Sequence, residues 1–508
     1  MTPKLSSADP TSLGTPLLSV LAVDTAPPGS KNSSVPALLT RDARLVEAAS
    51  RVLANGEFNA SAGDTLLLHN PNGLAAERLL LVGAGPALEL TAAKLRQAAG
   101  TAIRFAKDKG LRSLAILTPE SAVATADTVR AVIEGAILAD FDSDLYKSDR
   151  KDRSVADVTL LAPNTTSSTQ ELQSAFDQGL VIAESQNFAR SLVIEPGNIL
   201  TPTELGRRAC AMAAEVGLAC QVHSTEFLRE HKMNAFLAVA QGSAEPPALV
   251  ELHYQPAQTP PSGAPVLALV GKGITFDTGG ISIKPADGME KMKYDMAGAA
   301  AMLGAMRAIA LLKPSVRVLC LICSAENMPS GTAYRPGDVV TAMSGTTIEV
   351  MNTDAEGRMV LADGLHYART LGATHLIDAA TLTGACVVAL GKLNAGLFSN
   401  DEDACSRFTS AAQQTGESFW RLPCTDDYHD QIKSQIADIQ NTGVDRWGGA
   451  ITAAMFLKEF AAGTPWVHLD IAGQAWIDDV RPYIARGPSG VAVRSITEWV
   501  RSFERSSA

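Results

Sequence analysis

Histidine and cysteine are scarce in this chain of 508 residues, which contains eight histidines and seven cysteines. No HExxH motif or zinc-finger spacing occurs among the histidines, and this disfavours a histidine-based zinc site. The cysteines show no pattern typical of a disulfide framework. Cys320 and Cys323 lie in the apolar run VRVLCLICS, where we expect a buried strand with free thiols rather than a metal or redox site.

Long apolar runs and an excess of positive charge are also missing. No run reaches the roughly 18 apolar residues that span a bilayer, so we expect no membrane partner. The first forty or so residues lack the basic start and apolar core of a secretory signal. Together with free thiols, this predicts a cytoplasmic location. The net charge of −11 disfavours nucleic acid as a partner, because nucleic acid selects clustered Lys and Arg.

The length of the chain predicts at least two domains. Residues 1–168 alternate between strand and helix patterns, which predicts a smaller N-terminal α/β domain. Strands are expected at 17–23, 78–85, 113–119 and 155–163, and helices at 91–110 and 126–140. The sequence VGAGP at 82–86 lacks the third glycine of a dinucleotide-binding motif, so a turn is the favoured interpretation.

Residues 169–508 predict a larger C-terminal domain of three layers. A helical pattern at 171–193 connects it to the first domain. The runs PVLALVG, VRVLCLIC, THLIDAATL and PWVHLDIAG show little polar alternation. Strands of this kind are buried on both faces, which is typical of a mostly parallel central sheet between helices. The run MAGAAAMLGAMRAIALL at 296–312 predicts a helix whose small residues allow close packing on that sheet.

Charged residues gather where the predicted strands of this second domain end. Glycines at 271, 273, 279 and 280 surround the first of them and allow positive φ or close backbone approach. Since reactive groups of parallel sheets lie beyond the carboxyl ends of the strands, these side chains are expected to meet in one cleft. They are Lys272, Asp277, Lys284, Asp295, Asp354, Glu356 and Arg358.

Each acid taken alone has a structural explanation. Asp295 precedes an Ala-rich run and could cap a helix, while Asp354 and Glu356 could favour a helix N-terminus. In the heptapeptide NTDAEGR, Gly357 would let the chain turn into that helix. Taken together, however, four carboxylates in one cleft repel one another and would be partly protonated without compensating charge. Two divalent cations would supply that charge through oxygen ligands.

Several motifs carry a resemblance to a known family. VGKGITFDTGGISIKP, YDMAGAA, NTDAEGR, DAATLTGA and HLDIAG resemble the leucine aminopeptidase (cytosol aminopeptidase) family of two-metal exopeptidases. The resemblance is dense from about residue 190 to 500 and only architectural in the N-terminal domain. It implies a metal-dependent aminopeptidase that hydrolyses N-terminal leucine and other, mostly apolar, residues from peptides by means of a metal-activated water.

The resemblance also implies roles for single residues. The tighter metal would be held by Lys272, Asp277, Asp295 and Glu356. The more exchangeable metal would be held by Asp277, Asp354 and Glu356, with the Asp354 carbonyl. The ions would be Mn²⁺ or Zn²⁺. Lys284 would be the catalytic lysine, and Arg358 would hold a bicarbonate that acts as general base. By the same resemblance the pocket for the first substrate residue is lined by Met292, Asn352, Ala355, Thr381, Gly384 and Ala472.

The resemblance also implies expectations for the pocket, the assembly and the N-terminal domain. Ala475 stands where some relatives carry Met, so a strict preference for leucine is not expected. The assembly would be a homohexamer of two stacked trimers, with the N-terminal domain serving assembly and shielding. The alternatives are a hexameric DNA-binding or regulatory relative with aminopeptidase activity as a secondary property, and a two-metal phosphoester hydrolase.

Overall fold

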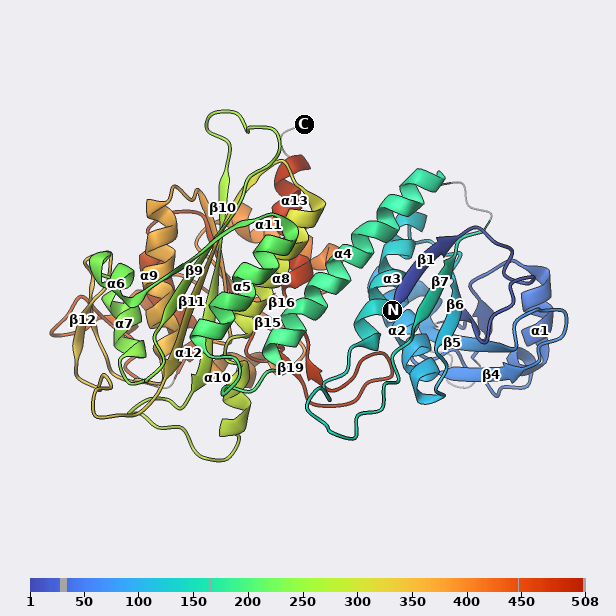
Figure 1. The fold of residues 1–508 in the computed structure, drawn as a ribbon, viewed down its shortest axis with the longest axis horizontal. Helices are drawn as coiled ribbons and strands as arrows, with labels where there is room; N and C mark the ends of the chain where they lie inside the picture. Colours follow the sequence, from blue (N-terminus) through green and yellow to red (C-terminus); the bar gives the residue numbers. More distant parts are fainter. Residues whose placement is uncertain (28–33, 164–166, 446, 506–508) are drawn as a thin grey trace. The chain divides into compact units, whose positions relative to one another are not determined.

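The computed structural model describes residues 1–27, 34–163, 167–445 and 447–505 (Figure 1). The chain forms two compact units. The first consists of Met1–Glu184 and Ile477–Gly487, and the second of Ser185–Trp476 and Pro488–Ala508. The helix α4 (Thr169–Val193) begins one residue after the boundary predicted at 168, and the chain passes from the first unit to the second within this helix.

The first unit contains a mostly parallel sheet in the order β1-β7-β6-β2-β5-β4, with β3 paired to β2. The edge strand β4 and the short β3 are antiparallel to their neighbours, and the other pairs are parallel. The bounds are β1 Thr2–Ser6, β2 Leu18–Asp24, β3 Pro36–Leu38, β4 Thr65–His69, β5 Arg78–Pro86, β6 Ser113–Leu117 and β7 Asp157–Leu161.

Helices cover both faces of this sheet. Alternate strand residues such as Leu21 and Ile116 pack against α2 (Ala92–Asp108) and α3 (Thr125–Asp140), whereas Val20 and Leu81 pack against α1 (Ala43–Ala54). The α/β character predicted for this region is confirmed. The VGAGP sequence lies inside β5 rather than in a turn, and a Cβ on Gly83 would lie 2.1 Å from the Ser61 carbonyl oxygen. Close backbone packing therefore explains this glycine.

The second unit contains an eight-stranded sheet in the order β16-β15-β18-β14-β10-β11-β9-β8. Its central strands β18, β14, β10 and β11 are parallel, while β9 and β8 add an antiparallel edge. The bounds are β8 Ala219–His223, β9 Ala248–Tyr254, β10 Val266–Asp277, β11 Arg317–Asn327, β14 His375–Ala380, β15 Ala395–Ser399, β16 Phe419–Arg421 and β18 Trp466–Asp470.

Two hydrophobic cores flank this sheet, as a three-layer fold requires. One contains the end of α4, α5 (Pro202–Val216), α8 (Ala297–Leu312), α11 (Glu402–Thr415) and α13 (Val493–Arg505). The other contains α7 (Asn234–Ala240), α9 (Glu356–Thr370) and α12 (Gly449–Ala461). The predicted three-layer α/β architecture is confirmed. The central strands β10, β11, β14 and β18 are buried on both faces because they are largely apolar.

Shorter elements complete the chain. Two of them, η2 and α10, border the carboxyl ends of β10 and β14. Their bounds are η1 Ala87–Glu89, α6 Thr225–Glu230, η2 Met289–Tyr294, β12 Val339–Thr341, β13 Thr347–Glu349, α10 Gly384–Leu390, η3 Asp426–Ile432, β17 Ile439–Gln440, β19 Trp476–Ile477 and β20 Gly487–Pro488.

The helix α8 packs against the sheet as closely as its small residues allow. A Cβ on Gly298 would lie 2.0 Å from the Ala379 carbonyl oxygen in β14, so no larger residue fits. The segment Met289–Leu312, which contains α8, is long and apolar enough to cross a membrane, but 83% of its apolar 18-residue window is buried inside the structure. It is therefore explained as a core helix.

The expectation for the cysteines is only partly correct. Cys320 and Cys323 are buried free thiols in β11, as predicted, and burial raises the pKa of both. Cys210 and Cys220, however, form a disulfide across the turn from α5 to β8, with a Cα–Cα distance of 5.4 Å. The helix folds back onto the adjacent strand and brings two cysteines ten residues apart within bonding distance. Sequence spacing alone does not predict such a pairing.

Candidate metal centre

The site is built on β10, which lies in the middle of the larger sheet. Lys272 lies within this strand and Asp277 is its last residue, and both are buried. The loop that follows turns sharply, with φ of +87° at Gly279 and +66° at Gly280. Gly271 lies inside the strand, where a Cβ would lie 2.7 Å from the Cα of Ala299. The glycines around this strand thus serve the two expected purposes, since Gly279 and Gly280 adopt positive φ and Gly271 allows close backbone approach.

Lys272 connects three separate segments of the chain. Its Nζ lies 2.9 Å from Asp295 Oδ2 and 2.8 Å from Glu356 Oε1, and it donates to the Thr381 carbonyl oxygen at 2.8 Å. Thr381 in turn donates its hydroxyl to Asp295 Oδ1 at 2.8 Å. The buried amine is therefore held between the end of η2, the start of α9 and the end of β14.

Gly357 has a different role from the predicted one. Its φ lies outside the left-handed region, so α9 needs no glycine for its turn. A Cβ at this position would instead lie 2.6 Å from Cδ and Cε of Lys272 and 2.7 Å from its Nζ. The glycine provides space for the lysine beside Glu356. The heptapeptide and the lysine some eighty residues earlier therefore form one packed unit.

Asp277, Lys284 and Asp354 form a second group beside the first. Lys284 Nζ lies 2.8 Å from Asp277 Oδ2 and also forms an ion pair with Asp354. Asp277 Oδ1 accepts hydrogen bonds at 2.8 Å from the Gly279 N–H and from the Asn327 side chain. Lys284 is about one-fifth exposed, whereas Asp277 is almost fully buried. The lysine therefore faces solvent from the edge of the carboxylate cluster.

The donor set fits divalent cations. Ligand atoms of Asp277, Asp354 and Glu356 lie within 4.8 Å of one another. Asp295 Oδ2 and Asp354 Oδ1 are buried and accept no hydrogen bond of normal geometry from the described residues; each forms an ion pair with a lysine. Buried carboxylate oxygens that accept no hydrogen bond are costly unless they coordinate a cation. Oxygen-rich sites suit Mg²⁺ and Mn²⁺, and Zn²⁺ also accepts carboxylates.

Electrostatics supports the same conclusion. Burial raises the pKa of Asp277, Asp295 and Asp354, and neighbouring carboxylates raise each further. Burial would lower the pKa of Lys272 and Lys284, but the surrounding carboxylates raise both above their ordinary values. Lys272 therefore keeps its proton in the absence of metal. A divalent cation bound by Lys272 would displace that proton, since ligands bind metal in their deprotonated forms.

Arg358 lies in the first turn of α9 and is buried. Its Nη1 donates to the Asn441 carbonyl oxygen at 2.7 Å, while its Nε has no hydrogen-bond partner among the described residues. Burial lowers the pKa of Arg358 to about 10, partly offset by Glu356, Asp470 and Asp354, so the guanidinium stays charged at neutral pH. A buried, charged donor with a free N–H at a helix start can hold an anion.

The residues predicted to line the substrate pocket belong to segments that meet at this site. Met292 is in η2, and Thr381 hydrogen-bonds to Asp295. Asn352 accepts a hydrogen bond from the Asp354 N–H at 2.8 Å, and Ala355 directly precedes α9. Gly384 begins α10, and the Ala472 N–H donates to Asp470 Oδ1 at 3.2 Å.

Several residues that hold the site together were not anticipated. Asn327, at the end of β11, donates to both Asp277 Oδ1 and the Thr353 carbonyl oxygen. Asn441 donates to the Asn352 carbonyl oxygen at 2.7 Å and accepts from the Met351 N–H at 2.8 Å. Asn327 could have been predicted from the sequence, because it ends the strand β11 that pairs with β10. No sequence signal marks Asn441.

Two residues considered from the sequence lie in the core. His468 is fully buried in β18, where its Nδ1 lies 2.6 Å from Asp378 Oδ1, a structural arrangement shared with Trp466. Ala475 is also buried and borders a small pocket of about 10 Å³, together with Ala297 and Ile471.

Comparisons with known proteins show which family the chain resembles over nearly its whole length. The chain matches the models for the cytosol aminopeptidase family, catalytic domain, over residues 187–497 and N-terminal domain over 20–150. It is 58% identical to a probable cytosol aminopeptidase of Acidobacterium capsulatum, covering 97% of this chain and 98% of that protein. It is 56% identical to one of Koribacter versatilis, covering 98% and 99%. The structure of the bottromycin maturation enzyme BotP in complex with Mn is similar, with a TM-score of 0.83 and 36% identity over 96% of this chain and 99% of that one.

Proposed function

The chain belongs to the cytosol aminopeptidase family, and from this premise we propose that it removes N-terminal amino acids, leucine and other mostly apolar residues, from peptides in a reaction that needs two divalent cations. The observation that carries the proposal is the cluster of Asp277, Asp354 and Glu356, whose ligand atoms lie within 4.8 Å of one another. A similar structure was determined in complex with Mn, which supports a divalent cation at this cluster.

Five residues would hold the cations. Lys272, Asp277, Asp295 and Glu356 would bind one, while Asp277, Asp354 and Glu356 would bind the other, so that two carboxylates bridge both. When bound, Mn²⁺ or Zn²⁺ would hold the free α-amino group of the substrate, polarise the scissile carbonyl and lower the pKa of water toward 7.

Lys284, in the loop after β10, and Arg358, in the first turn of α9, would act on the substrate. Lys284 carries a positive charge at the solvent edge of the carboxylates, where it can stabilise the oxyanion that develops on the scissile carbonyl. Arg358 would hold a bicarbonate through its unpartnered Nε, and the bicarbonate would accept the proton of the attacking water. With bicarbonate as the general base, no histidine or glutamate side chain is needed for that role.

The pocket for the first residue would be formed by Met292, Asn352, Ala355, Thr381, Gly384 and Ala472. The aliphatic groups of this set favour apolar side chains. Each methylene in such a pocket contributes only about 1–3 kcal/mol to discrimination, so the preference is expected to be broad.

A panel of aminoacyl p-nitroanilides with free and N-acetylated amino groups tests this function. Leu and Met substrates with free amines, whose side chains are similar in size, should be hydrolysed at rates within about 200-fold of each other, since apolar pockets discriminate weakly. Every N-acetylated counterpart should be inert. Hydrolysis of N-acetyl-leucyl p-nitroanilide at the rate of the free amine would show that the protein is not an aminopeptidase.

Replacing Arg358 by alanine tests the role of bicarbonate. The rate should fall by about 10²-fold or more while the metal content is unchanged, because a general base contributes about 10²–10⁴-fold. Added bicarbonate should restore part of the rate. Assays in bicarbonate-depleted buffer with Arg358→Ala and the wild type measure both effects, and Arg369→Ala at the other end of α9 is the control. If bicarbonate changes neither protein, the assigned base is wrong.

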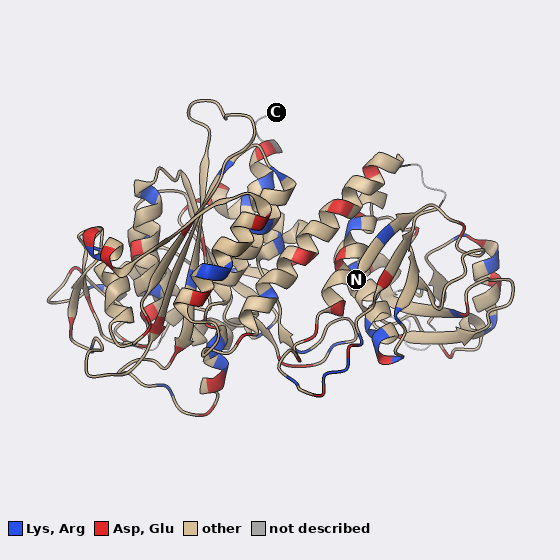
Figure 2. Ribbon diagram, in the orientation of Figure 1, with Lys and Arg blue, Asp and Glu red and all other residues tan. Residues whose placement is uncertain are grey.

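Assembly and location complete the proposal. By similarity to the family, the protein would form a homohexamer in the cytoplasm, with the N-terminal unit serving assembly and shielding. Nucleic acid and membranes are not expected as partners. The charge distribution supports this expectation, because Figure 2 shows Lys and Arg interspersed with Asp and Glu on the helices and loops of each unit.

A further inference from the structure

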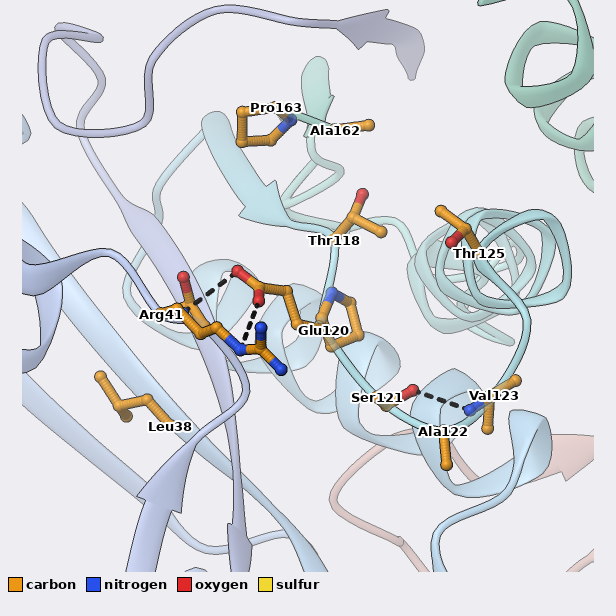
Figure 3. A pocket seen from close by; sticks show the side chains of 12 residues that line it. Leu38, Arg41, Thr118, Glu120, Ser121, Ala122, Val123, Thr125, Ala162 and Pro163 are labelled. Carbon is orange, nitrogen blue, oxygen red and sulfur yellow. Dashed lines mark hydrogen bonds and ion pairs between the residues drawn. The ribbon is translucent and has the colours of Figure 1, made fainter. Parts of the chain in front are cut away.

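A cavity of about 550 Å³ lies in the first unit, where its lining comes from the end of β3 and from the segments that follow β3, β6 and β7 (Figure 3). The two charged side chains of this lining pair with each other, since Arg41 Nε lies 3.5 Å from Glu120 Oε2. The pair is exposed, and its two charges compensate each other. A buried network of polar groups that the proposed reaction does not use lies instead beside the metal centre, in the second unit.

The network surrounds the loop that carries Lys284. This loop, residues 278–284, follows the end of β10 at Asp277 and lies outside any helix or strand. The Thr278 N–H donates to the Asn327 carbonyl oxygen at 3.0 Å, and the Lys284 N–H donates to the Thr278 carbonyl oxygen at 2.9 Å. The two ends of the loop are therefore fixed to each other and to β11. Between these ends the path of the loop depends on hydrogen bonds to other segments.

Thr353, the second residue of NTDAEGR, makes those hydrogen bonds. The Ser282 N–H donates to Thr353 Oγ1 at 2.8 Å, and the Thr353 N–H donates to Ser282 Oγ at 3.1 Å. The Thr353 hydroxyl donates in turn to the Gly279 carbonyl oxygen at 2.6 Å, and the residue is fully buried. This hydroxyl thus both accepts from and donates to the backbone of the loop, which a side chain of the same size without an oxygen could not do.

Two further side chains hold Thr353 itself. Its carbonyl oxygen accepts from the Tyr334 hydroxyl at 2.7 Å and from Asn327 Nδ2 at 3.0 Å. Tyr334 is 1% exposed and Asn327 is fully buried. Asn327 also donates to Asp277 Oδ1 at 2.8 Å. Satisfied hydrogen bonds in a buried network restrict the positions of the groups that they join, so Thr353 is a fixed point to which the loop is attached.

The loop and the heptapeptide carry two groups that pair at the edge of the carboxylate cluster. Lys284 lies two residues after Ser282, and Asp354 directly follows Thr353. Lys284 forms an ion pair with Asp354, and its Nζ also lies 2.8 Å from Asp277 Oδ2. The hydrogen bonds between Ser282 and Thr353 therefore set where the Lys284 ammonium lies relative to the carboxylates.

From this network we propose that Thr353 and Ser282 are positioning residues, which hold the Lys284 ammonium at the place where it contacts the scissile carbonyl. This role rests on the proposed function, in which Lys284 stabilises the oxyanion. Neither residue is assigned to a cation or to the substrate, so both act through Lys284. A displacement of about 1 Å at a reacting group can lower a rate by about 10²-fold, so loss of either hydroxyl slows the reaction without removing a ligand.

Replacing Thr353 by valine in two backgrounds tests this role. In the wild-type chain loaded with Mn²⁺, Thr353→Val should lower kcat for leucyl p-nitroanilide by about 10–100-fold, while KM and metal content change little. In Lys284→Met the same substitution should change kcat by less than about threefold, because the group that it positions is already absent. Thr353→Ser keeps the hydroxyl and should restore most of the rate. Thr341→Val, at an exposed threonine in β12, is the control and should behave like the wild type.

Hydrogen exchange measured by mass spectrometry gives a readout that does not depend on activity. The Ser282 and Thr353 amides should exchange slowly in the wild type. Thr353→Val should speed exchange at Ser282, and Ser282→Ala should speed exchange at Thr353, because each substitution removes the acceptor of the other residue's N–H. Ser282→Ala, at a half-buried position, should also lower kcat in the wild type but not in Lys284→Met. It carries the same comparison if Thr353→Val does not fold.

Three results would overturn the proposal. They are an unchanged kcat in both Thr353→Val and Ser282→Ala, an equal fold loss of kcat in the presence and absence of Lys284, and a loss of metal in proportion to the rate. Fast exchange of both amides in the wild type would refute the network itself. A wild-type protein that does not hydrolyse leucyl p-nitroanilide would instead refute the proposed function, so the two failures are distinguishable.

Discussion

Replacing Glu356 by alanine is expected to lower kcat/KM for a leucyl substrate by about 10³-fold or more and to remove metal from the protein. Glu356 is buried at the start of α9, and its Oε1 lies 2.8 Å from Lys272 Nζ. Its carboxylate is also within 4.8 Å of ligand atoms of Asp277 and Asp354. It is therefore one of the two carboxylates assigned to both cations, and its loss would affect both.

Metal content by mass spectrometry and steady-state kinetics measure this effect together. Glu356→Gln, which keeps the shape of the side chain but not its charge, should show nearly the same loss. Glu215→Ala, an exposed glutamate on α5, should keep both metal and rate. If Glu356→Ala retains the metal content of the wild type, the bridging role assigned to Glu356 is wrong.

Replacing Lys284 by methionine is expected to lower kcat by about 10²–10³-fold, as is usual when one donor to a developing oxyanion is removed. The ammonium of Lys284 contacts Asp277 and Asp354 but lies at the exposed edge of the cluster. Its position suits contact with the substrate rather than support of the fold. Metal content should therefore be unchanged, and KM should change much less than kcat.

Kinetics at several substrate concentrations separate these effects. Lys291→Met, an exposed lysine in η2, provides the matched control and should leave kcat unchanged. Lys284→Arg should recover part of the rate because it restores a cationic donor. An unchanged kcat in Lys284→Met, or a proportional loss of metal and rate, would contradict a role in stabilising the oxyanion.

The sequence was sufficient to predict the fold class and the convergence of the charged residues. Apolar strands without alternation indicate a parallel sheet, and side chains at the carboxyl ends of neighbouring parallel strands meet at one edge. This reasoning placed Lys272 and Asp277 beside the acids at the start of α9. In the structure Lys272 Nζ lies 2.8 Å from Glu356 Oε1, and ligand atoms of Asp277 lie within 4.8 Å of those of Asp354 and Glu356.

Features that depend on side-chain packing could not be predicted from the sequence. Gly357 suggested a turn, but its contact with the Lys272 side chain becomes visible only when strand and helix are packed together. The bond between Cys210 and Cys220 depends on how α5 folds back onto β8. The hydrogen bonds of Asn441 to the Asn352 segment likewise arise from a loop about ninety residues further along the chain.

The most direct test of the account follows hydrolysis of leucyl p-nitroanilide while metal-free protein is titrated with Mn²⁺ or Zn²⁺. Protein stripped by a chelator should be inactive, and activity should return fully as two equivalents of metal per chain are bound. Full activity in the metal-free protein would contradict the assignment of this carboxylate and lysine cluster as a two-metal catalytic site.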